Sequence, residues 1–247
     1  MPAYRRFPFP PAHPDDAGPA YGSRQFERFP SLLPVLTYSI MLWCVAVFFL
    51  LNRDDSGSVA TYKMAHFLGY TTHEDLAQGR WWGLIASTFV HVDLWHIVFN
   101  MLWLARLGPL MERGLGSWKT LAFFISAGFV SSSLQLFFGS PGIGFSGVVY
   151  AMGGFMWAAW PRYTGFLEGF TSNSLRWLLI WQALCFALSW GGMMPIANTA
   201  HISGMAFGFL AGLWACRGTR KGWYWLAATA ATLLGCVTLI IIAATGS

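Results

Sequence analysis

The chain has 247 residues, of which 55% are hydrophobic, 17% aromatic and 10% charged, with a mean hydropathy of +0.50. Apolar runs of about 20 residues, the length that spans a bilayer, recur along the chain and exclude an ordinary soluble domain. The net charge of +5 fits the positive-inside bias of membrane proteins and gives no reason to expect nucleic acid. We therefore predict an all-α polytopic membrane protein.

The first 33 residues contain seven of the twelve prolines and four arginines, without a long apolar run. We predict a disordered, Pro/Arg-rich cytosolic tail over residues 1–33. Seven hydrophobic segments follow, and the fourth is short. They lie near residues 34–51, 92–111, 118–138, 146–160, 174–190, 198–216 and 223–243.

The only long connection covers about residues 52–91, where Trp81 and Trp82 suit a membrane interface. The four cysteines fall in or beside apolar segments, far apart in sequence, and predict neither a disulfide framework nor a metal cluster. We expect no metal and no cofactor.

Lysine and arginine are distributed unevenly over the connections. If the N-terminus is cytoplasmic, 12 of the 15 basic residues lie on the inner side. The three on the outer side, Arg53, Lys63 and Arg80, all lie in the long loop. We therefore expect a cytoplasmic N-terminus and, after seven spans, an outer C-terminus.

This orientation places five polar residues in one leaflet. Ser146 begins the fourth segment, His201 lies in the first turn of the sixth, and His91, His96 and Asn100 descend the outer half of the second. His96 and Asn100 are four residues apart and share a helix face. Polar groups are costly inside a membrane and usually mark a functional site.

A glycine ridge predicts how two of these segments meet. The ridge on the sixth segment consists of Gly204, Gly208 and Gly212, and its counterpart on the fourth consists of Gly147, Ala151 and Gly154. Close packing of the two would bring the Ser146 hydroxyl within hydrogen-bond reach of the His201 imidazole, which is what an activated serine requires. Taken alone, however, a serine between small residues at a helix start is more typical of plain helix packing.

Taken together, these motifs resemble the rhomboid family of intramembrane serine proteases. The matching residues are His91-x4-His96-x3-Asn100, Gly144-Phe145-Ser146-Gly147 with Tyr150, Ala200-His201-x2-Gly204-x3-Gly208, and Glu112-x3-Gly116-Ser117. The resemblance covers about residues 34–216 as a six-helix catalytic core, and residues 217–247 resemble the extra C-terminal transmembrane helix of some members. One departure concerns the Trp-Arg pair of many members, because Trp82 is followed here by Gly83 and leaves Arg80 as the candidate substitute.

The resemblance implies a Ser-His dyad with Ser146 as nucleophile and His201 as general base, oriented by Tyr150. It also implies an oxyanion site made by His96, Asn100 and the Ser146 backbone N–H.

Within the same site, the resemblance implies support from His91 and Gly144. The implied substrates are single-span transmembrane proteins with a small residue before the cut and helix-weakening residues beyond it. The implied location is a bacterial cytoplasmic membrane, and the oligomeric state is left open.

Two other functions remain open at this point. The first is a catalytically silent rhomboid relative that binds membrane proteins, although such relatives lack the serine or the histidine that this chain has. The second is a transporter, although the chain lacks paired half-repeats and its polar residues lie in one leaflet. Labelling by a serine-reactive probe separates the protease from both.

Overall fold

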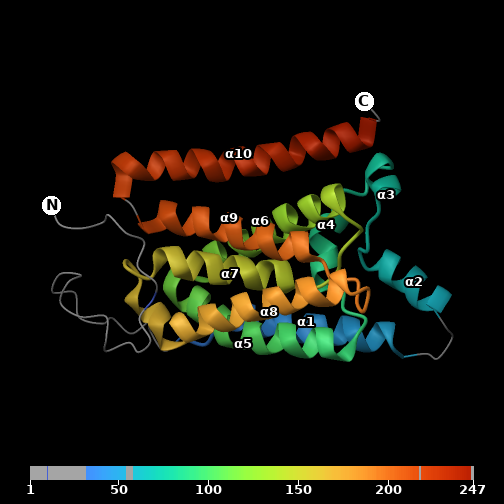
Figure 1. The fold of residues 1–247 in the computed structure, drawn as a ribbon, viewed down its shortest axis with the longest axis horizontal. Helices are drawn as coiled ribbons and strands as arrows, with labels where there is room; N and C mark the ends of the chain where they lie inside the picture. Colours follow the sequence, from blue (N-terminus) through green and yellow to red (C-terminus); the bar gives the residue numbers. More distant parts are fainter. Residues whose placement is uncertain (1–9, 11–31, 54–57, 217, 246–247) are drawn as a thin grey trace.

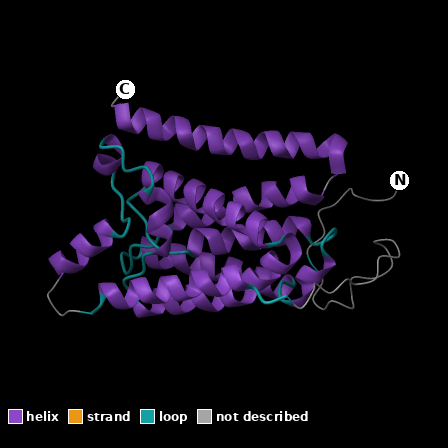
Figure 2. Cartoon of the chain, turned by 180° about the vertical axis from the view of Figure 1, so that it is seen from behind, coloured by secondary structure: helices purple, strands orange, loops and turns teal. Residues whose placement is uncertain are grey.

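The computed structural model describes residues 10, 32–53, 58–216 and 218–245 (Figure 1). Every regular element in this part of the chain is helical, as the view from behind also shows (Figure 2). The α-helices are α1 (Val35–Leu51), α2 (Ser58–Phe67), α3 (His73–Ala77), α4 (Gly83–Ala86), α5 (Leu94–Leu115), α6 (Ser117–Phe138), α7 (Ser146–Ala159), α8 (Ser172–Trp190), α9 (Asn198–Cys216) and α10 (Gly218–Thr245). Short 3-10 helices, η3 (Ser87–Phe89) and η4 (Thr164–Glu168), complete the described elements.

Seven of these helices, α1 and α5 to α10, coincide with the seven predicted segments. By length and composition α6 and α9 are each able to cross a membrane, and a third span results if Gly83–Phe89 and Leu94–Leu115 count as one. The helix α1 and the stretch Ala227–Ile242 are shorter apolar helices. The total of seven spans therefore stays a prediction. The predicted tail lies almost entirely outside the described residues.

The first turns of α5, α7 and α9 lie at one end of the molecule, together with α2, α3 and α4 (Figure 1). The predicted loop over residues 52–91 is therefore partly helical. Its last part, Gly83–Phe89, meets α5 at 94°. This end of the molecule carries the polar residues that the sequence singled out.

The helices α7 and α9 pack backbone against backbone. A Cβ added at Gly204 or Gly208 would clash with the carbonyl oxygens of Gly147 and Ala151, respectively. A Cβ at Gly154 would likewise clash with the Met205 carbonyl. The predicted glycine contact between the two helices is confirmed, and at Gly154, Gly204 and Gly208 only a residue without a Cβ allows it.

At the opposite end, Glu112 joins three helices. Its carboxylate accepts hydrogen bonds from the backbone N–H groups of Leu36 (2.9 Å) and Thr37 (2.8 Å), both in the first turn of α1. It also accepts from the hydroxyls of Thr37 and Ser117, each at 2.8 Å. The residue before α1, Pro34, makes no side-chain cap, so Glu112 serves as the cap from α5.

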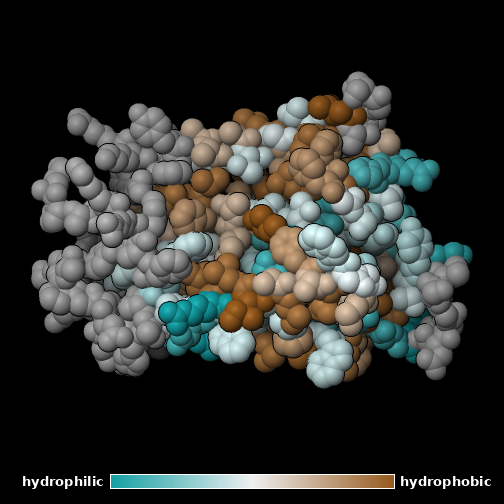
Figure 3. All heavy atoms as spheres, in the orientation of Figure 1, coloured by the Kyte–Doolittle hydropathy of each residue, from teal (hydrophilic) through white to brown (hydrophobic). Residues whose placement is uncertain are grey.

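Apolar surface extends across the middle of the molecule, whereas hydrophilic residues gather toward its ends (Figure 3). Much of this surface belongs to α8, whose exposed large side chains include Trp177, Ile180, Leu184, Phe186 and Trp190. An exposed apolar surface of this extent is compatible with contact to lipid tails.

Candidate active site

Ser146 and His201 meet at the first turns of α7 and α9. The Ser146 Oγ and the His201 Nε2 are 2.9 Å apart. The turn before Ser146 depends on Gly144, whose φ of 98° favours glycine. The direct contact follows from the close packing of the two helices.

The imidazole of His201 is buried and stacks on Tyr150. The two ring centroids are 4.5 Å apart and the ring planes are inclined by 18°. The Tyr150 hydroxyl donates to the carbonyl oxygen of Leu178 on α8, at 3.2 Å. The structure thus brings together three of the predicted residues. Ser146 contacts one ring nitrogen of His201, and Tyr150 stacks on the face of the same ring.

The second ring nitrogen of His201 has a partner that sequence reasoning missed. His201 Nδ1 lies 3.0 Å from Gln182 Oε1 on α8. The amide nitrogen of Gln182 donates to Asn198 Oδ1 at 2.8 Å. A polar amide within an apolar segment was the available signal, because such groups are costly in a membrane unless they have a partner.

His96 and His91 line the other side of the nucleophile turn. A Cβ at Gly144 would clash with the His96 ring. The rings of His91 and His96 contact each other edge to face, with their centroids 5.0 Å apart. His91 Nε2 accepts the backbone N–H of Phe145 at 3.3 Å. The supporting position predicted for His91 therefore has a direct contact to the residue before Ser146.

The prediction that His91 lies on the second long helix is wrong. His91 precedes α5, in the short link after η3, and α5 begins only at Leu94. The reason is the 94° change of direction between these helices, which takes residues 90–93 out of helical conformation.

Asn100 lies one turn beyond His96 on α5, as predicted, and it is buried. Its amide donates to the His96 backbone carbonyl at 2.9 Å. Among the described residues, no hydrogen bond joins it to Ser146. One amide proton is used in this bond, so the second remains for another acceptor.

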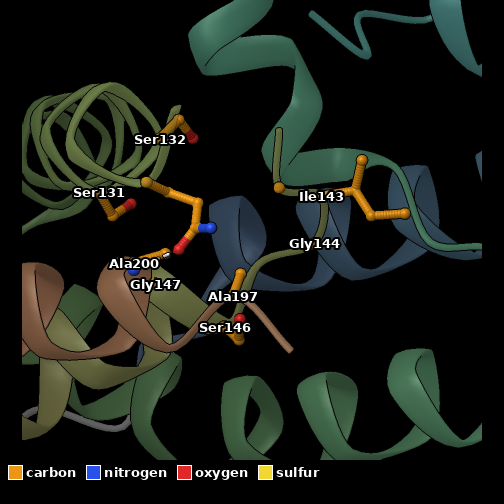
Figure 4. Close-up of a pocket in the computed structure, with 10 residues that line it drawn as sticks. Ser131, Ser132, Ile143, Gly144, Ser146, Gly147, Ala197 and Ala200 are labelled. Atoms are coloured by element: carbon orange, nitrogen blue, oxygen red, sulfur yellow. Dashed lines mark hydrogen bonds between the residues drawn. The ribbon is translucent and has the colours of Figure 1, made fainter. Parts of the chain in front are cut away.

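A small, partly open pocket of about 10 Å³ adjoins Ser146. Figure 4 shows Ser131 and Ser132 on one side of it and Ser146 and Ala197 on another. Gln135, which the sequence analysis did not single out, also lines this cavity, and its Oε1 accepts the backbone N–H of Ala200 at 3.1 Å. The cavity offers serine and glutamine groups able to hold water beside the nucleophile.

The loop that covers this end is anchored by Arg80. Its guanidinium donates to Asp75 Oδ1 at 2.9 Å and to the His66 carbonyl at 2.7 Å. It also lies over the Trp82 ring, 5.3 Å from the centroid. Burial opposes ionisation of Asp75, but hydrogen bonds from Thr72 and His66 lower its pKa below the ordinary value of 3.8.

Gly83 explains why the arginine stands on the other side of the tryptophans. A Cβ at Gly83 would clash with the Thr71 side chain and the Gly69 carbonyl. An arginine directly after Trp82 would therefore displace the loop. Arg80 reaches the loop from the preceding turn.

No group of three or more His, Cys, Asp or Glu side chains able to hold a metal ion occurs in the described part of the chain. The arrangement offers a serine hydroxyl in contact with an imidazole, beside a small pocket. This geometry suits nucleophilic catalysis by serine.

Known proteins share this sequence pattern. The model of the family described as Rhomboid domain matches residues 78–218. The Rhomboid protease GlpG of Yersinia pestis (strain Pestoides F) is 31% identical over 216 residues, covering 83% of this chain and 73% of that relative. Its namesake from Yersinia enterocolitica serotype O:8 / biotype 1B (strain NCTC 13174 / 8081) is 30% identical over the same shares of both chains. The chain belongs to the rhomboid family and is an integral membrane protein that acts as an intramembrane serine protease.

Proposed function

We propose that Ser146 is the nucleophile of this protease and His201 its general base. The observation that carries the proposal is the 2.9 Å contact between Ser146 Oγ and His201 Nε2. A free serine hydroxyl is a weak nucleophile near neutral pH, so a base has to take its proton as it attacks. The stacked Tyr150 ring holds the imidazole in the plane that this transfer requires.

Attack on a peptide carbonyl creates a negatively charged oxygen that needs donors. We assign this role to the Ser146 backbone N–H, to His96 and to Asn100. The first N–H groups of a helix lack intrahelical partners, and Ser146 is the first residue of α7. Donors aimed at developing charge are each worth about 2.7–4 kcal/mol in related hydrolytic sites.

The second half of the reaction is hydrolysis of the acyl-enzyme. Acylation has ended once His201 has passed the Ser146 proton to the leaving amine. In the hydrolysis step His201 accepts a proton from the water that attacks the ester carbonyl, and it gives that proton to Ser146 Oγ as the acyl bond breaks. The small pocket beside Ser146 supports this step, since its volume of about 10 Å³ is close to what one water molecule needs.

The proposed substrates are the transmembrane segments of single-span membrane proteins. The helix α7 has 14 residues and is about 21 Å long, against about 30 Å for a hydrocarbon core, so its first residue is recessed from the membrane surface. A hydrogen-bonded helix conceals its carbonyls, so the substrate must bend or unwind near the cut. With the N-terminus cytoplasmic, cleavage takes place in or near the outer half of a bacterial cytoplasmic membrane.

A fluorophosphonate probe tests the dyad directly. The wild type should be labelled at Ser146 and Ser146→Ala should not. His201→Ala should stay folded in detergent, but its labelling rate should fall by about 100-fold or more, because a general base usually contributes at least that factor. Ser203→Ala is the matched control, because its hydroxyl bonds within α9 to the Thr199 carbonyl (2.6 Å), and it should label like the wild type. Wild-type labelling of His201→Ala would contradict the dyad.

A further inference from the structure

We propose that Gln182 is a positioning residue that fixes the tautomer of the His201 imidazole. The inference rests on the proposed function, in which Ser146 gives its proton to His201. For that transfer the Nε2 atom must be unprotonated, so the proton of the neutral ring must sit on Nδ1. The atom that faces Nδ1 therefore decides whether the resting site is competent.

The group facing Nδ1 is the amide oxygen of Gln182, at 3.0 Å. An amide oxygen accepts and never donates, so it favours the ring that carries its proton on Nδ1. The opposite tautomer would leave two acceptors facing each other at this distance. It would also leave the Ser146 hydroxyl without an acceptor on Nε2.

A further hydrogen bond fixes the orientation of the Gln182 amide itself. Its nitrogen donates to Asn198 Oδ1 at 2.8 Å, and the Asn198 nitrogen donates in turn to Ser189 Oγ at 2.8 Å. With the proton of His201 on Nδ1, each residue of this network donates a hydrogen bond to the next. The order is Ser146, His201, Gln182, Asn198 and Ser189. Turning the Gln182 amide over would place its oxygen against Asn198 Oδ1 and its NH₂ group against Nδ1.

A neutral amide suits this place better than a carboxylate would. Serine hydrolases often hold their histidine with an aspartate, but an isolated carboxylate is costly to bury in a medium of low polarity. An amide oxygen accepts the same proton without bringing a charge. It stabilises the imidazolium less, and positioning is then its main contribution.

The titratable groups around His201 come from three helices. His96 of α5 interacts with it across the site, and Tyr150 of α7 stacks on it. The Cys185 thiol of α8 lies near Tyr150. None of these three residues carries a negative charge in its ordinary form at neutral pH. A carboxylate introduced at position 182 would therefore be the first anion among these neighbours.

Two variants in full-length protein test the assignment. Gln182→Leu keeps the shape but removes the acceptor, and it should lower kcat about 5- to 10-fold, with KM changed less than about twofold. Gln182→Glu restores an acceptor. It should recover most of kcat at neutral pH and move the acid limb of the pH–rate profile to higher pH, because a carboxylate favours the imidazolium.

The tautomer can also be read without measuring activity. In ¹⁵N-histidine spectra, with the signals assigned by their loss in His201→Ala, the wild-type ring should be protonated on Nδ1. In Gln182→Leu the same signals should indicate a mixture of the two tautomers. Ser203→Ala should leave both the spectrum and kcat unchanged, since its hydroxyl does not contact the network.

The outcomes separate this inference from the proposed dyad. If His201→Ala lost labelling at Ser146 while Gln182→Leu kept wild-type kcat and the wild-type tautomer, the dyad would stand and the role of Gln182 would fall. A Gln182→Glu pH profile identical to wild type would overturn it as well. If His201→Ala labelled normally, the dyad itself would fall.

Discussion

The imidazole of His201 is held from two directions, which restricts both its tilt and its rotation. Tyr150 covers the face of the ring, with planes inclined by only 18°. Gln182 engages the edge through Nδ1. A stacked ring prevents tilting, but only a hydrogen bond at the edge distinguishes one ring nitrogen from the other.

The proposed role of Asn100 as an oxyanion donor can be tested by kinetics. Its amide is tied to the His96 carbonyl at 2.9 Å, and one proton remains for an oxyanion. We expect Asn100→Ala to lower kcat about 100-fold, with little change in KM, because a donor to developing charge acts mainly on the transition state. Steady-state kinetics with a transmembrane substrate measures both constants.

A change in KM alone would instead assign Asn100 to helix packing. Thermal unfolding of the same variant is the control, because the lost bond to the His96 carbonyl lies within one helix and should cost little stability.

The serine, the histidine and the stacking tyrosine were predictable because each occupies a fixed place in a short motif. Gln182 was not, since nothing in the sequence of α8 says which of its faces points to His201. Nor was Gln135 recognised, although it bonds the backbone of Ala200 directly before His201. Both are amides whose role depends on which helix lies opposite, and that is a property of tertiary packing.

At the scale of helices, α7 and α9 form a contact without side chains at its centre. Gly204 faces the Gly147 backbone and Gly208 faces the Ala151 backbone. The distance from Ser146 to His201 is therefore set by how closely two backbones approach. Any added atom in this contact changes the catalytic distance directly.

We predict that Gly204→Val lowers both stability and labelling at Ser146. A Cβ there overlaps the Gly147 carbonyl, so the cost should exceed the about 1–3 kcal/mol of ordinary overpacking. Gly235→Val on α10 is the matched control, because a Cβ at Gly235 meets nothing within 4 Å. Wild-type melting and labelling by Gly204→Val would show that the helices do not touch here in the membrane.

The loop held by Arg80 should respond to acid through Asp75. Its folded pKa lies below the ordinary 3.8, so its ionised form stabilises the loop above that pH, and this stabilisation is lost as pH falls through the lowered pKa. Protection against hydrogen exchange over residues 70–82, taken relative to the intrinsic rate at each pH, should therefore be high at pH 5 and fall below about pH 4.

Two carboxylates allow a matched test. Asp75→Asn should be less protected than the wild type at pH 5, and the difference should shrink below about pH 4. Glu74→Gln, at an exposed neighbouring site, should behave like the wild type. Loss of protection already between pH 5 and 7 would show that Asp75 does not control the loop.

The long helices were predictable because their apolar runs are long and uninterrupted. The short helices α2, α3 and α4 were not, since segments of 4 to 10 residues carry no clear period and depend on the surfaces beneath them. The displacement of His91 from α5 has the same origin. A change of direction by 94° is set by what Gly83–Phe89 packs against, not by its composition.

At the scale of the molecule, one end carries the site and the opposite end carries most of the basic connections. The helix starts of α5, α7 and α9 share the site end (Figure 1). The orientation predicted from lysine and arginine would place the site end on the outer side of the membrane. Together they give a direct topological prediction.

In a cysteine-free background, a cysteine at position 70 should react with an impermeant reagent added to intact cells. A cysteine at position 20 should react only after lysis. Both substitutions should leave Ser146 labelling unchanged, which checks that the protein is folded. Equal reactivity of the two positions from one side would overturn the shared-leaflet placement of the site.

The last helix, α10, packs on α9 and α6 and reaches α3, so its final described turn at Thr245 lies at the same end as Ser146 (Figure 1). A polypeptide fused beyond Thr245 would therefore start at the end of the molecule that carries Ser146. A short flexible linker there would hold a tethered transmembrane segment at an effective concentration on the order of millimolar. The cleavage rates of weakly binding substrates could then be compared in such fusions, because cleavage within one molecule does not depend on the enzyme concentration.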